Sequence, residues 1–97
     1  MQITDDVIKK IANDTGIDTV ENLTKAALIS FLKDRKMKIK LDILETQRRY
    51  DVASARDLEG KIKKSEIPEH PAWEDLILQE NLEAELLTIE DDIKALQ

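Results

Sequence analysis

The stretch from Thr19 to Tyr50, TVENLTKAALISFLKDRKMKIKLDILETQRRY, decides the fold of this chain. It contains neither glycine nor proline, so no residue in it interrupts a helix. Thr19 is suited to cap the start because its hydroxyl accepts the free N–H of Asn22, and Glu21 favours the positive end of the helix dipole. One helix over this stretch is about 47 Å long at ~1.5 Å per residue. A compact domain of this size is only about 32 Å across, so the stretch predicts an elongated, all-α protein built on one long central helix.

Apolar residues fall on two faces of this expected helix. One stripe is the expected interface between copies of the chain: Leu28, Leu32, Ile39, Ile43 and Tyr50. The other stripe starts beside it and ends almost opposite: Val20, Leu23, Ala27, Phe31, Met37, Leu41 and Leu44. A helix that is apolar on both sides needs cover on both sides. The rest of a short chain offers little cover, so we expect a homodimer or a higher oligomer.

The composition favours a single helical domain over residues 1–97. Hydrophobic residues make up 41% of the chain and charged residues 37%, a balance typical of long helices. The absence of cysteine excludes disulfides and thiolate metal sites, and it is compatible with a reducing compartment. The first residues do not resemble a signal peptide, and no apolar stretch approaches the ~18 residues of a membrane span. We therefore expect a cytoplasmic protein that does not bind membranes.

Helix-breaking and helix-capping residues divide the chain into four helices, near 4–15, 19–50, 55–64 and 72–96. Gly16 ends the first helix, because glycine takes the left-handed conformation at little cost. Ser54 and Asp57 form a weak capping box for the third, and Pro68 and Pro71 exclude helix from the connection before the last. The domain then consists of a short helix and corner (1–18), the long helix (19–50), a short helix with a proline-rich connection (51–71) and an acidic last helix (72–97).

The last helix carries its own apolar pattern. One row has the alternating spacing of a coiled-coil seam: Leu82, Leu86, Ile89, Ile93 and Leu96. A second row is offset from it: Trp73, Ile77, Ala84 and Leu87. The helix is therefore broad-faced, and a structural coiled-coil oligomerisation module is one interpretation of the chain.

Charge is distributed unevenly along the chain. The net charge is −2 over residues 1–32, +5 over 33–64 and −9 over 65–97. The two charged thirds suit each other as neighbours in a helical hairpin, yet the excess also favours a charged partner. An alternative function is therefore a nucleic-acid-binding transcriptional regulator that uses residues 33–64. Its candidate phosphate contacts are the cations of the basic run: Lys33, Arg35, Lys36, Lys38 and Lys40. The same run, Lys33 to Lys38, is where the long helix is expected to kink if it kinks at all.

Catalytic and metal-binding chemistry has little basis in the sequence. His70 is the single histidine, and it has no serine or cysteine nucleophile nearby in the sequence. No pair of ligands shows a recognised metal spacing, and there is no glycine-rich phosphate loop. We therefore expect a non-enzymatic protein with no catalytic residues, no cofactor and no metal.

Two segments resemble known families. The short first helix followed by VENLTKAALISFL resembles the two helices of ribbon-helix-helix DNA-binding proteins, although only Met1, Gln2 and Ile3 stand where that family has its reading strand. The segment RRYDVASARDLEGKIKKSEIPEHPAWEDLILQENLEAEL, about half the chain, resembles the C-terminal half of small helical prokaryotic proteins encoded beside toxins and treated as antitoxins. The matching residues are Tyr50, Ser54, Leu58, Glu59, Glu66, Ile67, Trp73 and Glu74, while Asp51 and Ser65 stand where glycine is more usual.

This second resemblance implies a protein that binds and neutralises a toxin encoded nearby. The excess of acid in the last third suits a basic surface, such as that of a nuclease. We accordingly expect the partner-binding surface on the last helix, with Trp73 as the apolar anchor and an acidic rim made of Glu80, Glu83, Glu85 and Asp92.

Overall fold

The computed structural model describes residues 2–97. Four helices account for the fold: α1 (Asp5–Thr15), α2 (Val20–Tyr50), α3 (Ala55–Lys63) and α4 (Glu69–Leu96). Over this described range there is no strand and no helix long and apolar enough to cross a membrane. The molecule measures 60 × 27 × 17 Å, and its radius of gyration of 19.6 Å far exceeds the ~13 Å of a compact 100-residue domain. The expected elongated, all-α fold is confirmed.

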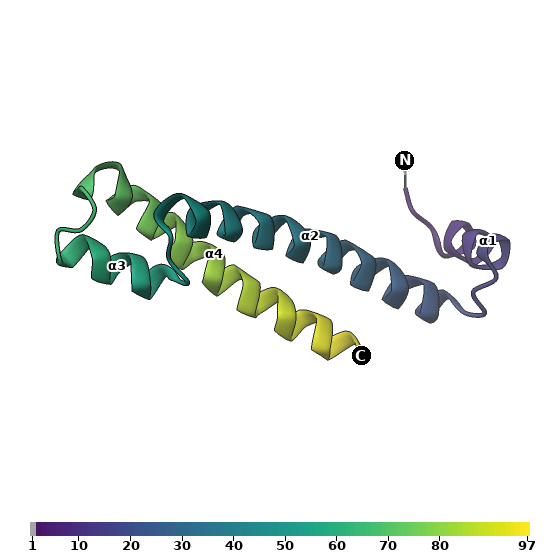
Figure 1. The fold of residues 1–97 in the computed structure, drawn as a ribbon. Coiled ribbons are helices and arrows are strands. Elements are labelled where there is room, and N and C mark those ends of the chain that lie inside the picture. The colour runs from purple at the N-terminus through teal and green to yellow at the C-terminus, as the bar shows by residue number, and fades with distance from the viewer. Residues whose placement is uncertain (1) are drawn as a thin grey trace.

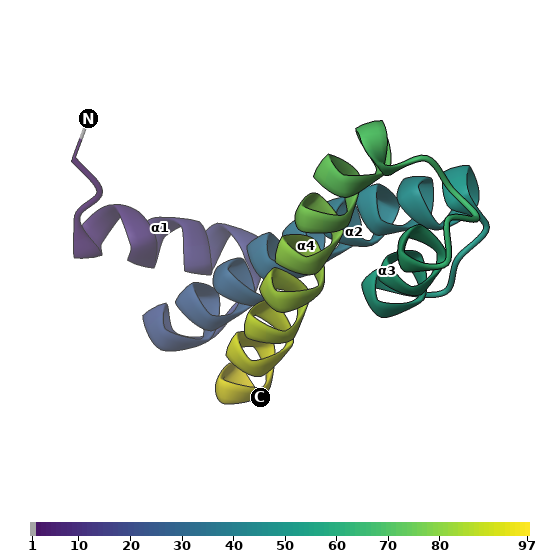
Figure 2. The same cartoon turned by 90° about the vertical axis from the view of Figure 1, so that its left-hand side faces the viewer.

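The central feature is an antiparallel hairpin of α2 and α4 (Figure 1). α3 packs against α4 at the closed end of the hairpin, and α1 packs on α2 at the open end. Figure 2 shows α1 and α3 projecting on opposite sides of the hairpin. α2 is one continuous helix through the charged run from Lys33 to Lys38, so this run does not break the helix.

The helix ends follow the local chemistry of the sequence. The hydroxyls of Thr4, Thr19 and Ser54 each accept a backbone N–H three residues on, at 3.3, 3.0 and 3.2 Å. Gly16 ends α1 in the left-handed conformation at φ 77°, and Asp51 does the same for α2 at φ 53°. These contacts satisfy backbone groups that a helix terminus leaves unpaired.

The start of α4 departs slightly from the expected boundary. The helix is bounded at Glu69, but His70 has an extended backbone with φ −114° and ψ 126°. The regular helix therefore begins at Pro71, where a proline fits because the first helical N–H has no partner within the helix. This agrees with a helix expected from residue 72.

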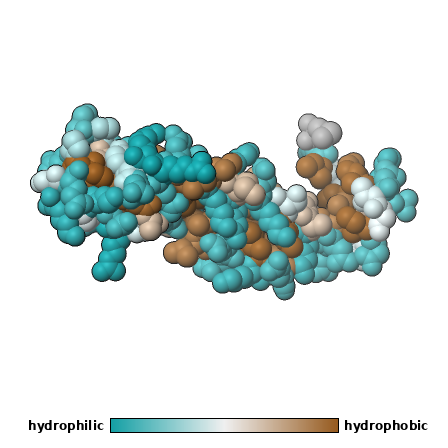
Figure 3. Space-filling view, in the orientation of Figure 1, coloured by the Kyte–Doolittle hydropathy of each residue, from teal (hydrophilic) through white to brown (hydrophobic). Residues whose placement is uncertain are grey.

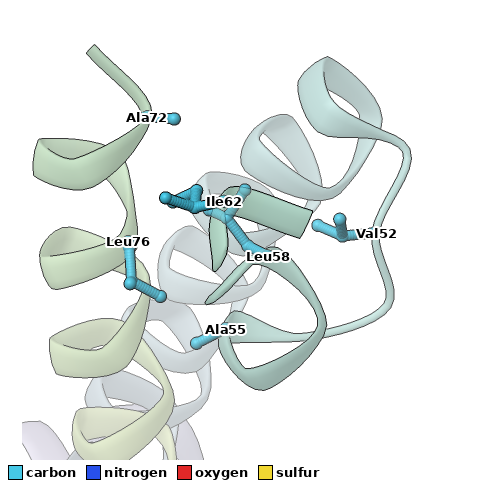
Figure 4. Close-up of a cluster of buried hydrophobic side chains, with 6 residues drawn as sticks. All are labelled: Val52, Ala55, Leu58, Ile62, Ala72 and Leu76. Carbon is cyan, nitrogen blue, oxygen red and sulfur yellow. The ribbon is translucent and has the colours of Figure 1, made fainter. Parts of the chain in front are cut away.

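Two hydrophobic clusters hold the hairpin together. The first joins α3 to the start of α4 (Figure 4) and contains Val52, Ala55, Leu58, Ile62, Ala72 and Leu76. The second joins α2 to the seam of α4 and contains Ile39, Ile43, Leu82, Ile89 and Ile93. The coiled-coil spacing of α4 is thus used within the chain.

The stripe expected between copies lies mainly inside this second cluster. Ile39 and Ile43 are only 1% and 8% exposed because α4 covers them, so the prediction that they form an oligomer interface is wrong. Leu32 is partly buried against the same cluster, and Tyr50 against the first. Leu28 alone of the five is exposed. Intramolecular packing has taken the place of self-association on this face of α2.

Shortening a side chain to alanine should have different effects on the two faces of α2. Ile39→Ala should lower the free energy of unfolding by about 2–4 kcal/mol, because it leaves a cavity in the second cluster. Leu41→Ala, at a side chain that is 57% exposed, should change it by no more than about 0.5 kcal/mol. Urea unfolding followed by circular dichroism measures both. Equal losses would mean that Leu41 is buried too.

Gly60 offers a stabilising substitution inside α3. A Cβ built there meets nothing within 4 Å, and the residue is helical. Gly60→Ala should raise the free energy of unfolding by about 0.5–1 kcal/mol through the better helix propensity of alanine. Thermal unfolding compared with Gly16→Ala is the test, because Gly16 has a positive φ that strains alanine. A loss of stability in Gly60→Ala would contradict the geometry.

Candidate protein-interaction surface

The face of α2 that points away from α4 is apolar and uncovered. Leu41 is two residues from both Ile39 and Ile43, so its side chain lies about 200° around the helix from theirs. We define the α2 outer stripe as the exposed residues that share or border this face: Phe31, Met37, Leu41 and Leu44. These four residues belong to the second stripe seen in the sequence, whose first two members, Val20 and Leu23, are half-buried.

α4 has a matching uncovered row. Ala84 follows the buried Leu82 by two residues, and Leu87 precedes the buried Ile89 by two. We define the α4 outer stripe as the exposed row on this side: Trp73, Ile77, Ala84 and Leu87. Trp73 is 50% exposed and Leu87 is 67% exposed. In the space-filling view, patches of apolar surface lie between hydrophilic residues along the length of the molecule and around α1 (Figure 3).

The residues predicted for partner binding divide into two groups. Trp73 and Glu80 lie on or within the α4 outer stripe, and both are exposed. Asp92 is exposed but lies about 100° around the helix from Trp73. Glu83 and Glu85 do not belong to a free acidic rim, because both are engaged inside the chain.

Glu83 fixes α3 to α4. Its carboxylate accepts the backbone N–H of Ala55 at 2.8 Å, at the start of α3, and the side-chain amide of Gln79 at 3.4 Å. Gln79 is fully buried, and its Oε1 has no partner among the described residues. Glu85 instead pairs with Arg35 of α2 at 2.5 Å. Neither role could be predicted from the sequence, because both depend on contacts between distant segments.

The basic run of α2 does not form one continuous cationic patch. Arg35 and Lys36 point to acidic residues of α4, with Lys36 at 3.9 Å from Glu90. Lys38 pairs with Asp34 at 3.2 Å. Lys33 and Lys40 have no acidic group within 4.0 Å among the described residues. Of the five candidate nucleic-acid contacts, these two are therefore free of ion pairs within the chain.

A polar cluster ties the end of α2 to α4. The hydroxyl of Tyr50 donates to Asp75, and the same carboxylate oxygen accepts Arg49 at 3.2 Å. Arg49 also pairs with Glu45 at 2.8 Å. Burial, followed by the hydrogen bond to Asp75, raises the pKa of Tyr50 above its ordinary value. The negative charge of Asp75 raises the pKa of Arg49.

Other candidate sites are not assembled in the described part of the chain. Within residues 2–97, no group of three or more His, Cys, Asp or Glu side chains gathers as a metal site. The Nδ1 of His70 lies 3.0 Å from a carboxylate oxygen of Glu74 on the exposed first turn of α4. Residues 2–4, where a ribbon-helix-helix protein has its strand, form no strand here.

Comparison with known proteins gives one match. The model of the family described as "Uncharacterized protein MJ0235 family" matches residues 1–97. The search of curated proteins and the search of solved structures each found no match.

The tyrosine cluster predicts a specific pH dependence. The folded-state pKa of Tyr50 is raised, so the stabilisation is present below the unfolded-state value of about 10 and is lost as the pH rises through the higher folded-state value. Tyr50 is the single tyrosine, so ultraviolet absorbance of the phenolate reports it directly. The folded protein should titrate at a higher pH than the urea-unfolded chain. Asp75→Asn should shrink the difference, and equal midpoints in the two states would contradict the structure.

Proposed function

We propose that this chain, which belongs to the MJ0235 family, is a non-enzymatic module that binds a partner protein through the outer face of α4. The observation that supports this most is the α4 outer stripe, a row of apolar side chains left exposed on a helix whose other apolar row is buried. Exposed apolar surface of this kind, bordered by polar residues, is typical of interaction sites. Trp73 is the anchor, because tryptophan dominates binding energy at interfaces.

The charge around this stripe indicates the chemistry of the partner. Residues 73–93 contain eight acidic residues and no lysine or arginine. Several of the acids pair with α2, but Glu80, Asp91 and Asp92 are exposed and have no ion pair among the described residues. A basic surface on the partner is therefore attracted to this face, and the attraction speeds the encounter.

The antitoxin resemblance supplies the class of partner. The similar segment, residues 48–86, contains the corner of the hairpin, α3 and most of the α4 outer stripe. We propose a cytoplasmic antitoxin-like role, in which the acidic face of α4 covers a basic, nucleic-acid-binding surface of a toxin encoded nearby. Neutralisation then results from competition, because α4 occupies the surface that the toxin needs for its substrate.

The nucleic-acid-binding alternative has less support. Three of its five candidate contacts, Arg35, Lys36 and Lys38, face acidic groups of the same chain. Binding to phosphates by the remaining cations would be weak and strongly dependent on salt. A structural coiled-coil module is the other alternative, and it requires no partner other than the chain itself.

The proposal is tested by capture of the products of adjacent reading frames on the tagged, full-length chain. Trp73→Ala should weaken the captured complex at least about 30-fold, the effect of losing a hot spot worth about 2 kcal/mol. Glu80→Gln should mainly slow association and reduce its dependence on salt.

Leu78→Ala is the matched control, because Leu78 is as exposed as Trp73 but lies outside the α4 outer stripe. Capture that is equally strong in Trp73→Ala and in the control would place the binding site elsewhere. Retention of duplex DNA in place of a protein would favour the regulator alternative.

A further inference from the structure

We propose that a second copy of this chain docks head-to-tail on the hairpin, with its α4 outer stripe lying along the α2 outer stripe of the first copy. This contact needs no other protein, and it uses the same α4 outer stripe as the partner proposed above, so one copy cannot make both contacts at once. It accounts for both apolar faces that the hairpin leaves uncovered.

The two outer faces have the same spacing. Along α2 the outer positions Met37, Leu41, Leu44 and Arg48 follow each other at intervals of four, three and four residues. Along α4 the outer positions Trp73, Ile77, Glu80 and Ala84 follow the same intervals. This is the spacing with which two helices pack side chains into each other's gaps. Each row is about 17 Å long at ~1.5 Å per residue, so the two rows match in length.

An antiparallel alignment brings these rows into register. When Leu44 lies opposite Ile77 of the second copy, Met37 falls opposite its Ala84, Leu41 opposite its Glu80 and Arg48 opposite its Trp73. A similar antiparallel alignment, within about one helical turn of this one, exists within the chain, where Arg49 pairs with Asp75 and Arg35 pairs with Glu85. The α4 helix of the second copy therefore runs along α2 in the same antiparallel direction as α4 does within the chain.

Charge decides which faces meet. Lys33, Lys40 and Arg48 flank the α2 outer stripe without an acidic partner within 4.0 Å among the described residues, whereas residues 73–93 of α4 carry only acids among their charged groups. Two α2 stripes would bring cations together, and two α4 stripes would bring acids together. α2 against α4 pairs opposite charges, and it places the guanidinium of Arg48 over the ring of Trp73.

The placement of the stripes determines the symmetry. The α2 outer stripe faces away from α4 and the α4 outer stripe faces away from α2, so both cannot be used between the same two copies in an isologous dimer. The contact is heterologous, and each added copy presents a new free stripe unless a ring closes. Two rows of four side chains bury less than the ~1,200 Å² of a standard interface, so the contact is weak and depends on concentration and salt.

Two double variants of the full chain, called edge variants, test this. Met37→Glu with Leu41→Glu disables the α2 outer stripe, and Ile77→Gln with Leu87→Gln disables the α4 outer stripe. All four positions are exposed, so the hairpin should still fold, which circular dichroism checks. Leu78→Gln is the control, because it changes an exposed leucine outside both stripes. Sedimentation equilibrium from micromolar to millimolar concentration measures the mass.

The expected mass of the unmodified chain and of the control rises with concentration, and the rise is smaller at high salt. Each edge variant alone stays at the monomer mass, and an equimolar mixture of the two reaches twice that mass and no more. The proposal is overturned if either edge variant still dimerises alone, because the contact is then isologous. It is equally overturned if the unmodified chain remains monomeric over the whole range, or if the mixture shows no dimer.

Discussion

α2 has apolar residues on two of its faces, and α4 covers one of them. A helix from Val20 to Tyr50 without glycine or proline is too long to be surrounded by so short a chain, and it has apolar residues on both sides. The chain covers one side by folding α4 back along it, and Ile39 and Ile43 become core residues as a result. Among residues 2–97, no helix covers the outer stripe on the other side. The elongated shape and the exposed outer stripes are therefore two results of the same shortage of chain.

Electrostatics reinforces this hairpin. The basic middle third and the acidic last third lie side by side, and ion pairs between α2 and α4 join Arg35 to Glu85 and Arg49 to Asp75. The pairs are partly exposed, so each contributes little to stability. Their effect is mainly on alignment, because a shift of α4 along α2 separates all of them. The acids outnumber the bases, so a negative excess remains on α4.

Local signals in the sequence were sufficient to predict the helices but not the use of their faces. Thr19, Ser54 and Gly16 act on neighbouring residues, so capping chemistry alone indicated where helices start and stop. The choice between the two stripes of α2 was wrong because both are apolar, and only the packing of α4 distinguishes them. Similarly, the acidic residues Glu83 and Glu85 look like Glu80 in the sequence. Their contacts with Ala55 and Arg35, across 28 and 50 residues, become visible only in the fold.

The position of α3 gives the rod two unequal ends. At the closed end, Leu58 and Leu76 are fully buried and the carboxylate of Glu83 holds the start of α3, so this end of the hairpin is the more tightly packed one. At the open end, the tips of α2 and α4 lie near Leu28 and Leu96, and neither of these residues belongs to a hydrophobic cluster. Thermal fluctuation therefore separates the tips first, and amide hydrogens exchange fastest there. Unfolding of the hairpin should therefore begin at this open end and reach the closed end last.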